Sequence, residues 1–235
     1  MSWVRGMGME GGSPAILFAL DLAFMQEQLP TLLRAALVTV QLSGLAVLLG
    51  IVVGLLLGSW RVIGPAWLQT LIQWFVNVVR GVPPLVHIAI IYFALPRLGL
   101  VLNEFWTGVA ALTIIAAGYE VEIVRAALQS VEEGQTEAAF AVGMDRGMTL
   151  RWILLPQALQ RMIPPLTNEL ANVIKASSLL SVISVKELTK VGNDLIFEHF
   201  VVAEVLIPVA ILYVLIVSLL THTSRWLEER LGIPT

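Results

Sequence analysis

The chain has 235 residues, of which 57% are hydrophobic and 13% charged, and its formal net charge at pH 7 is −3. A soluble domain carries about 25% charged residues, so this composition indicates a membrane protein with no room for a separate soluble catalytic domain. The weak negative charge argues against nucleic acid as a partner, and the absence of cysteine excludes disulfides and thiolate sites.

Residues 1–30 are expected to form an N-terminal segment. Residues 1–13 are rich in Gly and Met and are expected to be weakly held. From Pro14 to Gln28 the apolar pattern is interrupted by Asp21, which favours a helix lying at the membrane surface. A solvated leader without a fixed position remains an alternative. No convincing cleavable signal peptide is found, because the early apolar run is short.

The stretch from Ala35 to Trp60 contains no charge and exceeds the ~20 residues that a spanning helix needs. Gly50, Gly54 and Gly58 recur on one face, a spacing that lets helix backbones approach closely in lipid. General tolerance of glycine in membrane helices is the alternative reading.

Pro65 to Pro96 is predicted to form the second span, bent at the Pro83–Pro84 pair because proline removes backbone donors. Arg80 lies within it, and a guanidinium at membrane depth is costly and usually partnered. Arg80 is therefore expected to help line or gate the pathway, and the alternatives are that it snorkels to the interface or holds a fixed internal ion pair. His87 is interpreted as a structural histidine.

The third span is predicted to begin at about Phe105. Glu122 and Arg125 lie three residues apart near its end and share one helical face, which favours a structural ion pair. A polar segment, residues 134–156, follows. Thr136 is expected to cap a short helix there, and Gly143 suits its C-terminal end, where a positive φ is needed.

Met162 to Val185 is predicted to form the fourth span, and Val205 to Ser224 the fifth. Residues 168, 172 and 175 of the fourth span share one face, with Glu169 beside it. Polar groups on one side of a membrane helix point at the bundle interior or a water-filled path. A buried network without a ligand is the alternative. Lys186 to His199 is expected to be a polar outer segment, and Arg225 to Arg230 an exposed tail.

Several motifs of the chain resemble, in order, those of ABC-importer permeases of the polar amino-acid type. Glu137-Ala138-Ala139 followed by Gly143 and by Leu155-Pro156 resembles the EAA motif of that family. Other matching elements are Arg80-Gly81-Val82-Pro83-Pro84-Leu85, Tyr119 with Glu122 and Arg125, Asn168-Glu169, and Lys175 with Ser177-Ser178-Leu179.

This resemblance implies an all-α membrane protein of the type I importer fold, with about five transmembrane helices and a cytoplasmic coupling helix between the third and fourth. The transmembrane domain would cover residues 31–230, leaving 231–235 as a tail. Residues expected to couple the chain to an ATPase are Glu137, Ala138, Ala139, Gly143, Met144 and Pro156. Residues expected along the substrate pathway are Arg80, Glu122, Asn168, Glu169, Asn172 and Lys175.

The resemblance also implies the partners: a cytoplasmic ABC ATPase dimer, a second identical or homologous permease subunit, and an external or periplasmic solute-binding protein that delivers the amino acid. The chain has no G-x-x-x-x-G-K-[ST] sequence, so it is expected to hold no cofactor, with ATP and Mg bound by the ATPase. The expected location is the bacterial cytoplasmic (inner) membrane, multi-pass, with the N-terminus outside and the C-terminus inside. The distribution of basic residues has the expected sign with a small margin.

Two departures from the family pattern make the expected pocket less polar. Ile115, Ala116 and Ala117 precede Tyr119 where related permeases often have Asn or Ser, and Ala176 follows Lys175 where an acid is usual. Either the substrate is handled differently, or the chain is the half of a heterodimer that binds substrate weakly. The alternative functions are accordingly a permease for a different small solute or the non-substrate-binding half of a heterodimeric amino-acid permease. Glu120 has no counterpart in the pattern. An intramembrane enzyme is disfavoured because three scattered histidines show no metal spacing, and an export permease or scaffold is a further alternative.

Overall fold

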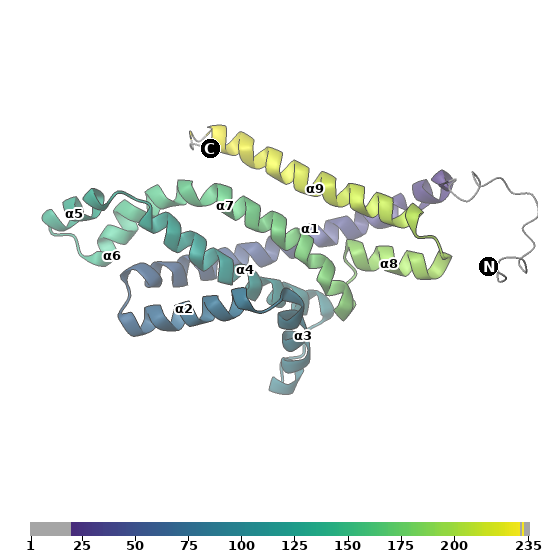
Figure 1. Ribbon diagram of the computed structural model, residues 1–235, viewed down its shortest axis with the longest axis horizontal. Helices are drawn as coiled ribbons and strands as arrows, with labels where there is room; N and C mark the ends of the chain where they lie inside the picture. Colours follow the sequence, from purple (N-terminus) through teal and green to yellow (C-terminus); the bar gives the residue numbers. More distant parts are fainter. Residues whose placement is uncertain (1–19, 231, 233–235) are drawn as a thin grey trace, which may run out of the picture.

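The computed structural model describes residues 20–230 and residue 232, and this part of the chain contains helices and no strands. The helices form an elongated bundle (Figure 1). The short helices α5 (Glu133–Ala141) and α6 (Arg146–Thr149) lie at one end of it. Helix α8 (Leu188–His199) lies at the opposite end.

Three described helices are long and apolar enough to cross a membrane: α1 (Leu22–Ile63), α4 (Glu104–Gln129) and α9 (Ala203–Arg230). The pair α2 (Ala66–Gly81) and α3 (Pro84–Ala94) adds a fourth if it counts as one broken span. Helix α7 (Leu155–Ala176) has the length of a span but is more polar than these three helices. It corresponds to the expected fourth crossing.

Helix α1 is 42 residues long and begins where the Asp21 side chain accepts a hydrogen bond from the Phe24 N–H at 2.9 Å. It therefore includes the described end of the expected surface helix, residues 22–28, and continues into the first span without a break. Residues 14–19 of that expected helix lie outside the described residues.

The expected bend in the second span is present and sharp. Helices α2 and α3 differ in direction by 107°, and Val82 and Pro83 between them have extended backbone. Consecutive prolines cannot donate to the preceding turn, so the helix ends at Gly81 and restarts at Pro84. A 3-10 turn, η3 (Pro96–Leu98), closes α3.

Helix α4 is the centre of the bundle and packs along α1. The prediction of close approach is confirmed, since Gly50, Gly54 and Gly58 are all buried and face α4. A methyl group added at Gly58 would lie 2.7 Å from side-chain carbons of Val124. A hydrophobic core cluster along the same pair of helices includes Leu42 of α1 and Leu112 of α4, together with Leu180.

The polar segment forms a helix–turn–helix whose first helix starts earlier than predicted. Helix α5 begins at Glu133, so Thr136 lies inside it and the predicted Thr136 cap is wrong. The C-terminal prediction is confirmed. Gly143 has φ +82°, its N–H donates to the Phe140 carbonyl at 3.0 Å, and the Met144 N–H donates to the Ala139 carbonyl at 3.1 Å. A five-residue π-turn, η4 (Leu150–Leu154), leads from α6 into α7.

The remaining elements attach α7 and α9 to the bundle. A 3-10 helix, η5 (Ser177–Ile183), follows α7 and leads towards α8. The predicted tail after Ser224 is part of a helix, because α9 continues to Arg230. Arg225, Glu229 and Arg230 are exposed as predicted, whereas Glu228 is buried. The Ser224 hydroxyl donates to Glu228 at 2.7 Å and lies 2.6 Å from the Thr167 hydroxyl of α7, so a polar contact joins the two helices.

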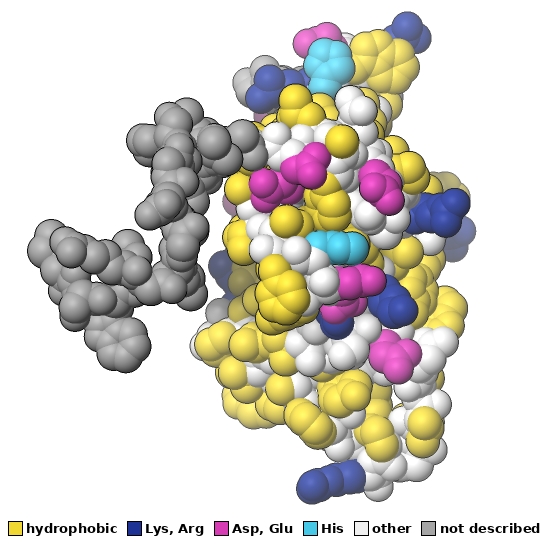
Figure 2. Space-filling view, turned by 90° about the vertical axis from the view of Figure 1, so that its right-hand side faces the viewer, with side chains coloured by type: hydrophobic (Ala, Val, Ile, Leu, Met, Phe, Trp, Pro, Cys, Tyr) yellow, Lys and Arg dark blue, Asp and Glu magenta, His cyan; other side chains and the backbone are white. Residues whose placement is uncertain are grey.

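The opposite end of the bundle is closed by a second buried polar cluster. Glu187 caps α8, accepting from the backbone N–H groups of Thr189 and Lys190 and from the Tyr213 hydroxyl at 2.9 Å. Figure 2 looks onto this end, where acidic side chains gather among hydrophobic ones.

Candidate functional site

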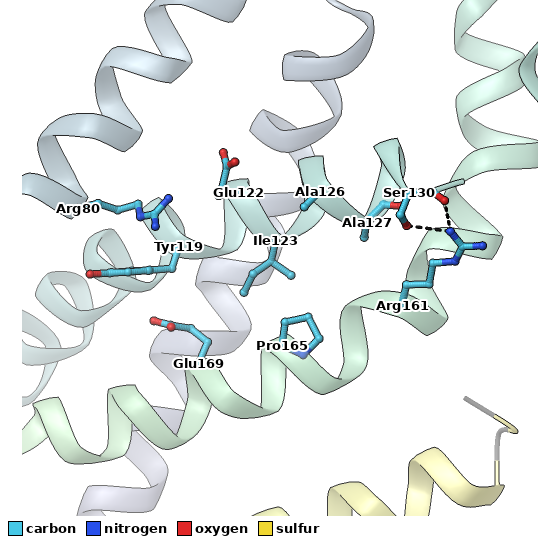
Figure 3. Close-up of a pocket in the computed structure, with 10 residues that line it drawn as sticks. All are labelled: Arg80, Tyr119, Glu122, Ile123, Ala126, Ala127, Ser130, Arg161, Pro165 and Glu169. Carbon is cyan, nitrogen blue, oxygen red and sulfur yellow. Dashed lines mark hydrogen bonds between the residues drawn. The ribbon is translucent and has the colours of Figure 1, made fainter. Parts of the chain in front are cut away.

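A cavity of about 410 Å³ lies between α2, α4 and α7 (Figure 3). Its lining combines four charged side chains with an aromatic ring and an apolar floor. The residues that line it are Arg80, Tyr119, Glu122, Ile123, Ala126, Ala127, Ser130, Arg161, Pro165 and Glu169. Of the six residues predicted along the substrate pathway, the fold brings Arg80, Glu122 and Glu169 together here.

Arg80 enters the cavity from the last turn of α2. Its guanidinium carbon lies 5.4 Å from the centre of the Tyr119 ring on α4. Within the described residues Arg80 forms no ion pair, so its expected use in a fixed internal pair is not what the structure shows. A guanidinium stacked on a ring keeps its edge N–H groups available to an anionic ligand.

Glu122 is already neutralised by the protein. The Arg125 Nε donates to Glu122 Oε1 at 2.9 Å, and Arg61 Nη1 from α1 lies 3.8 Å from Glu122 Oε2. The predicted structural ion pair is confirmed and extended by a second arginine. Figure 3 shows the Glu122 carboxylate pointing away from the Glu169 side of the cavity.

Glu169 is the acid that faces the open part of the cavity. It is buried on α7, with 6% of its surface exposed, and in Figure 3 it points towards Tyr119 and Arg80. It belongs to no ion pair among the described residues. The cavity thus presents a cationic group on one wall and a carboxyl group on the other.

The other three predicted pathway residues lie elsewhere. Asn168, Asn172 and Lys175 are exposed on α7, on the face beside the buried Glu169. The periodicity of the helix placed them correctly on one face, but that face is uncovered in this chain. These three residues therefore form a polar stripe on the surface of a membrane helix.

Sequence reasoning missed Arg161, which closes the cavity at the end near α5. Its Nη1 donates to the Ser130 hydroxyl at 2.9 Å and also to the Ser130 carbonyl, joining α7 to the end of α4. The two residues are 31 positions apart, and no local pattern relates them.

Glu120, which had no place in the family pattern, lies outside the cavity. It is fully buried at the α1–α4 contact, and neither carboxyl oxygen has a hydrogen-bond partner among the described residues. Glu120 lies on the face of α4 that packs against Gly50 and Gly54 of α1.

The predicted coupling residues sit together at the α5–α6 end. Glu137, Ala138, Gly143 and Pro156 are exposed and Met144 is partly exposed, whereas Ala139 is buried against the bundle. A protruding helix with exposed small and acidic side chains is available to another protein. Pro156 stands in the first turn of α7, where proline is tolerated because the N–H has no intrahelical partner.

Residues 50–232 match the family model described as "Binding-protein-dependent transport system inner membrane component". The chain belongs to this family. It is 38% identical over 208 residues to the glutamine transport system permease protein GlnP of Escherichia coli strain K12, covering 87% of this chain and 94% of that one. With the arginine transport system permease protein ArtQ of Bacillus subtilis strain 168 it shares 29% identity over 213 residues, or 90% and 97% of the two chains.

Solved structures agree with the fold. A chain in the crystal structure of an amino acid ABC transporter with histidines superposes with a TM-score of 0.83 at 30% identity, covering 90% of this chain and 99% of that one. The MetNI methionine ABC transporter in an inward-facing conformation gives a TM-score of 0.78 at 23% identity, covering 87% and 97%. The predicted type I importer fold is therefore confirmed.

The chain is a permease subunit of an ABC importer and not an enzyme, and ATP hydrolysis belongs to a separate subunit. Membership of a binding-protein-dependent inner-membrane family places it in the inner membrane as a multi-pass protein. It also implies an ATPase and a substrate-binding protein as partners.

Proposed function

We propose that the chain passes a polar amino acid through the membrane and that the cavity between α2, α4 and α7 holds the amino acid during transport. This proposal depends on one observation: Arg80 and Glu169 lie on opposite walls of the cavity. An amino acid carries a carboxylate and an ammonium group on one carbon, and these would meet the guanidinium of Arg80 and the carboxylate of Glu169. The glutamine and arginine permeases among the relatives support a polar side chain.

The apolar part of the lining suits a substrate that is held weakly enough to leave. The apolar lining consists of Ile123, Ala126, Ala127 and Pro165, whose side chains form no hydrogen bonds. The orientation of the substrate would therefore be fixed by Arg80 and Glu169. Glu122 would contribute through its ion pair with Arg125 by holding α4 rigid, without binding the substrate itself.

The uncovered polar stripe of Asn168, Asn172 and Lys175 supports a second permease subunit. An ammonium group and two amides on the surface of a membrane helix are unfavourable against lipid and instead face protein or a water-filled path. We assign this stripe to the pathway between two permease subunits, identical or homologous. It would continue the route beyond the cavity of one chain.

The coupling residues would transmit the motion of the ATPase. In this proposal an ABC ATPase dimer, which binds ATP and Mg, grips α5 through Glu137 and Ala138, and the Gly143 turn passes the movement to α6 and α7. The α5–α6 end then faces the cytoplasm, the N-terminus lies outside and the C-terminus inside. Arg146, Arg151 and Arg161 at that end support this orientation through the preference of basic residues for the cytoplasmic side.

The proposal can be tested with the complete complex, including the ATPase and the solute-binding protein, reconstituted in liposomes. A panel of amino acids is scanned for stimulation of ATP hydrolysis, and uptake of the best one is measured for Glu169→Gln and Arg80→Ala. Either variant should lower uptake at least about tenfold, because each removes one charge-assisted contact of the substrate. Leu219→Ala, an exposed residue of α9, is the control for handling and assembly.

Normal uptake kinetics in both variants would remove the cavity from the pathway. Stimulation by another class of small solute, with no response to any amino acid, would overturn the assignment of substrate.

A further inference from the structure

The break between α2 and α3 leaves a backbone carbonyl without its usual donor. In a continuous helix the Val79 carbonyl accepts from the N–H of residue 83, but residue 83 is proline and has no N–H. The last backbone bond of α2 runs from the Val82 N–H to the Val78 carbonyl at 3.1 Å. The Val79 carbonyl is the next acceptor in the series and lies inside the protein, where an unbonded carbonyl is unfavourable.

His87, on the first turns of α3, supplies the missing donor. Its Nε2 lies 3.1 Å from the Val79 carbonyl oxygen, and only 9% of the residue is exposed. Because a carbonyl can only accept, Nε2 carries the proton in this contact. The bond spans eight residues and joins α3 to the end of α2 across the 107° bend.

The side chain of the same residue, Val79, is held from the other direction by α4. It fills the space in front of Gly118, where an added methyl group would lie 2.4 Å from Val79 Cγ1. Val79 is therefore restrained twice, through its carbonyl by His87 and through its side chain by the notch at Gly118.

The next residue on each helix belongs to the cavity. Arg80 follows Val79, Tyr119 follows Gly118, and the Arg80 guanidinium carbon lies 5.4 Å from the centre of the Tyr119 ring. A shift or rotation of the α2 end that released Val79 would move Arg80 away from Tyr119 and from its position opposite Glu169 in Figure 3.

We propose that His87 is a positioning residue for transport: by bonding the carbonyl that Pro83 leaves free, it holds Arg80 over Tyr119 in the substrate cavity. This inference rests on the proposed function of Arg80 as a substrate contact. It gives a role to a histidine that an apolar environment alone would mark as structural. His87 touches no substrate in this scheme and acts only through the backbone next to Arg80.

A matched pair of substitutions separates the hydrogen bond from the polarity of the side chain. His87→Gln places an amide N–H at nearly the reach of Nε2 and can still donate to the Val79 carbonyl. His87→Asn is equally polar but one methylene shorter, so it cannot reach. Both are measured in the reconstituted complex with its ATPase and binding protein, alone and combined with Arg80→Ala.

His87→Asn should raise the substrate concentration for half-maximal uptake about tenfold, the effect of one lost buried hydrogen bond, and leave ATP hydrolysis without substrate unchanged. His87→Gln should restore most of the wild-type value. In the Arg80→Ala background the two variants should be indistinguishable, because residues that act through one another are not additive.

Three outcomes decide the matter. Equal effects of His87→Asn in the presence and absence of the Arg80 side chain would overturn the positioning role. So would loss of folded protein in His87→Asn with His87→Gln behaving no better, as judged by size-exclusion chromatography in detergent. Normal transport by Arg80→Ala alone would overturn the proposed function of Arg80. Additive effects in the double variant of His87→Asn and Arg80→Ala would instead overturn only the positioning role of His87.

Discussion

Gly50 of α1 and Glu120 of α4 occupy adjoining space so tightly that no side chain fits between them. A methyl group added at Gly50 would lie 2.1 Å from Glu120 Oε2, and one added at Gly54 would lie 2.9 Å from Glu120 Cβ. Gly50, Gly54 and Gly58 of α1 therefore have two effects. They let α1 and α4 pack closely, and Gly50 and Gly54 leave room for the buried side chain of Glu120.

Gly50→Ala is expected to destabilise the protein by about 1–3 kcal/mol, since the added methyl overpacks the α1–α4 contact. Combining it with Glu120→Ala should recover part of the loss, because the shortened side chain vacates the space that the methyl needs. Thermal unfolding of purified protein in detergent measures both effects.

The chain offers a matched control for that experiment. Gly44 lies on the same helix, and an added methyl there meets nothing within 4 Å. Gly44→Ala should therefore leave the melting temperature unchanged or raise it slightly. Equal losses at positions 44 and 50 would show that helix propensity, and not the contact with Glu120, determines the result.

Gly143→Val should uncouple the chain from its ATPase while leaving the bundle folded. A β-branched residue at φ +82° is strained by about 1–3 kcal/mol, and the turn that ends α5 would open or shift. Co-purification of the ATPase with tagged permease should fall about tenfold, as that strain predicts.

Gly134→Ala is the control for the coupling turn. Gly134 belongs to the same helix α5, an added methyl meets nothing within 4 Å, and its φ is not positive. Unchanged recovery of the ATPase with Gly143→Val would mean that the αL turn is not needed for docking.

Glu187→Gln should change the dependence of stability on pH. Burial raises the pKa of Glu187 above its ordinary value, although the N–H groups of Thr189 and Lys190 and the Tyr213 hydroxyl partly oppose this. Because the pKa of Glu187 is higher in the folded than in the unfolded protein, protonated Glu187 favours the folded state. This contribution to the free energy of unfolding is fully present below the ordinary pKa of glutamate and is lost as the pH rises through the folded-state pKa. The uncharged glutamine escapes this loss.

The melting temperature of Glu187→Gln relative to wild type should therefore rise as the pH increases above the ordinary pKa of a glutamate, by roughly 2–4 °C for each 1 kcal/mol relieved in a chain of this length. Glu198→Gln, an exposed residue of the same helix α8, is the control and should show no such trend. A difference between Glu187→Gln and wild type that stays constant with pH would contradict the expectation.

The sequence by itself was enough for features that depend on neighbours in the chain. The uncharged run of α1, the break at Pro83–Pro84, the Glu122–Arg125 pair and the αL turn at Gly143 are all set within one or two helical turns. Their physics is local, in hydropathy, missing donors, i,i+3 spacing and glycine φ, so pattern reasoning reaches them. The start of α5 was misplaced because Thr136 is a good cap that the chain does not use as one.

Only the tertiary structure decided which surface each of these features meets. Periodicity put residues 168, 172 and 175 on one face of α7, but packing turned Glu169 into the cavity and left the other three uncovered. Glu120 resting on Gly50, Arg161 bound to Ser130 and His87 bonded to the Val79 carbonyl likewise depend on how the helices dock. Helical spacing determines which residues share a face, whereas the partner of that face follows from close packing between segments distant in the chain.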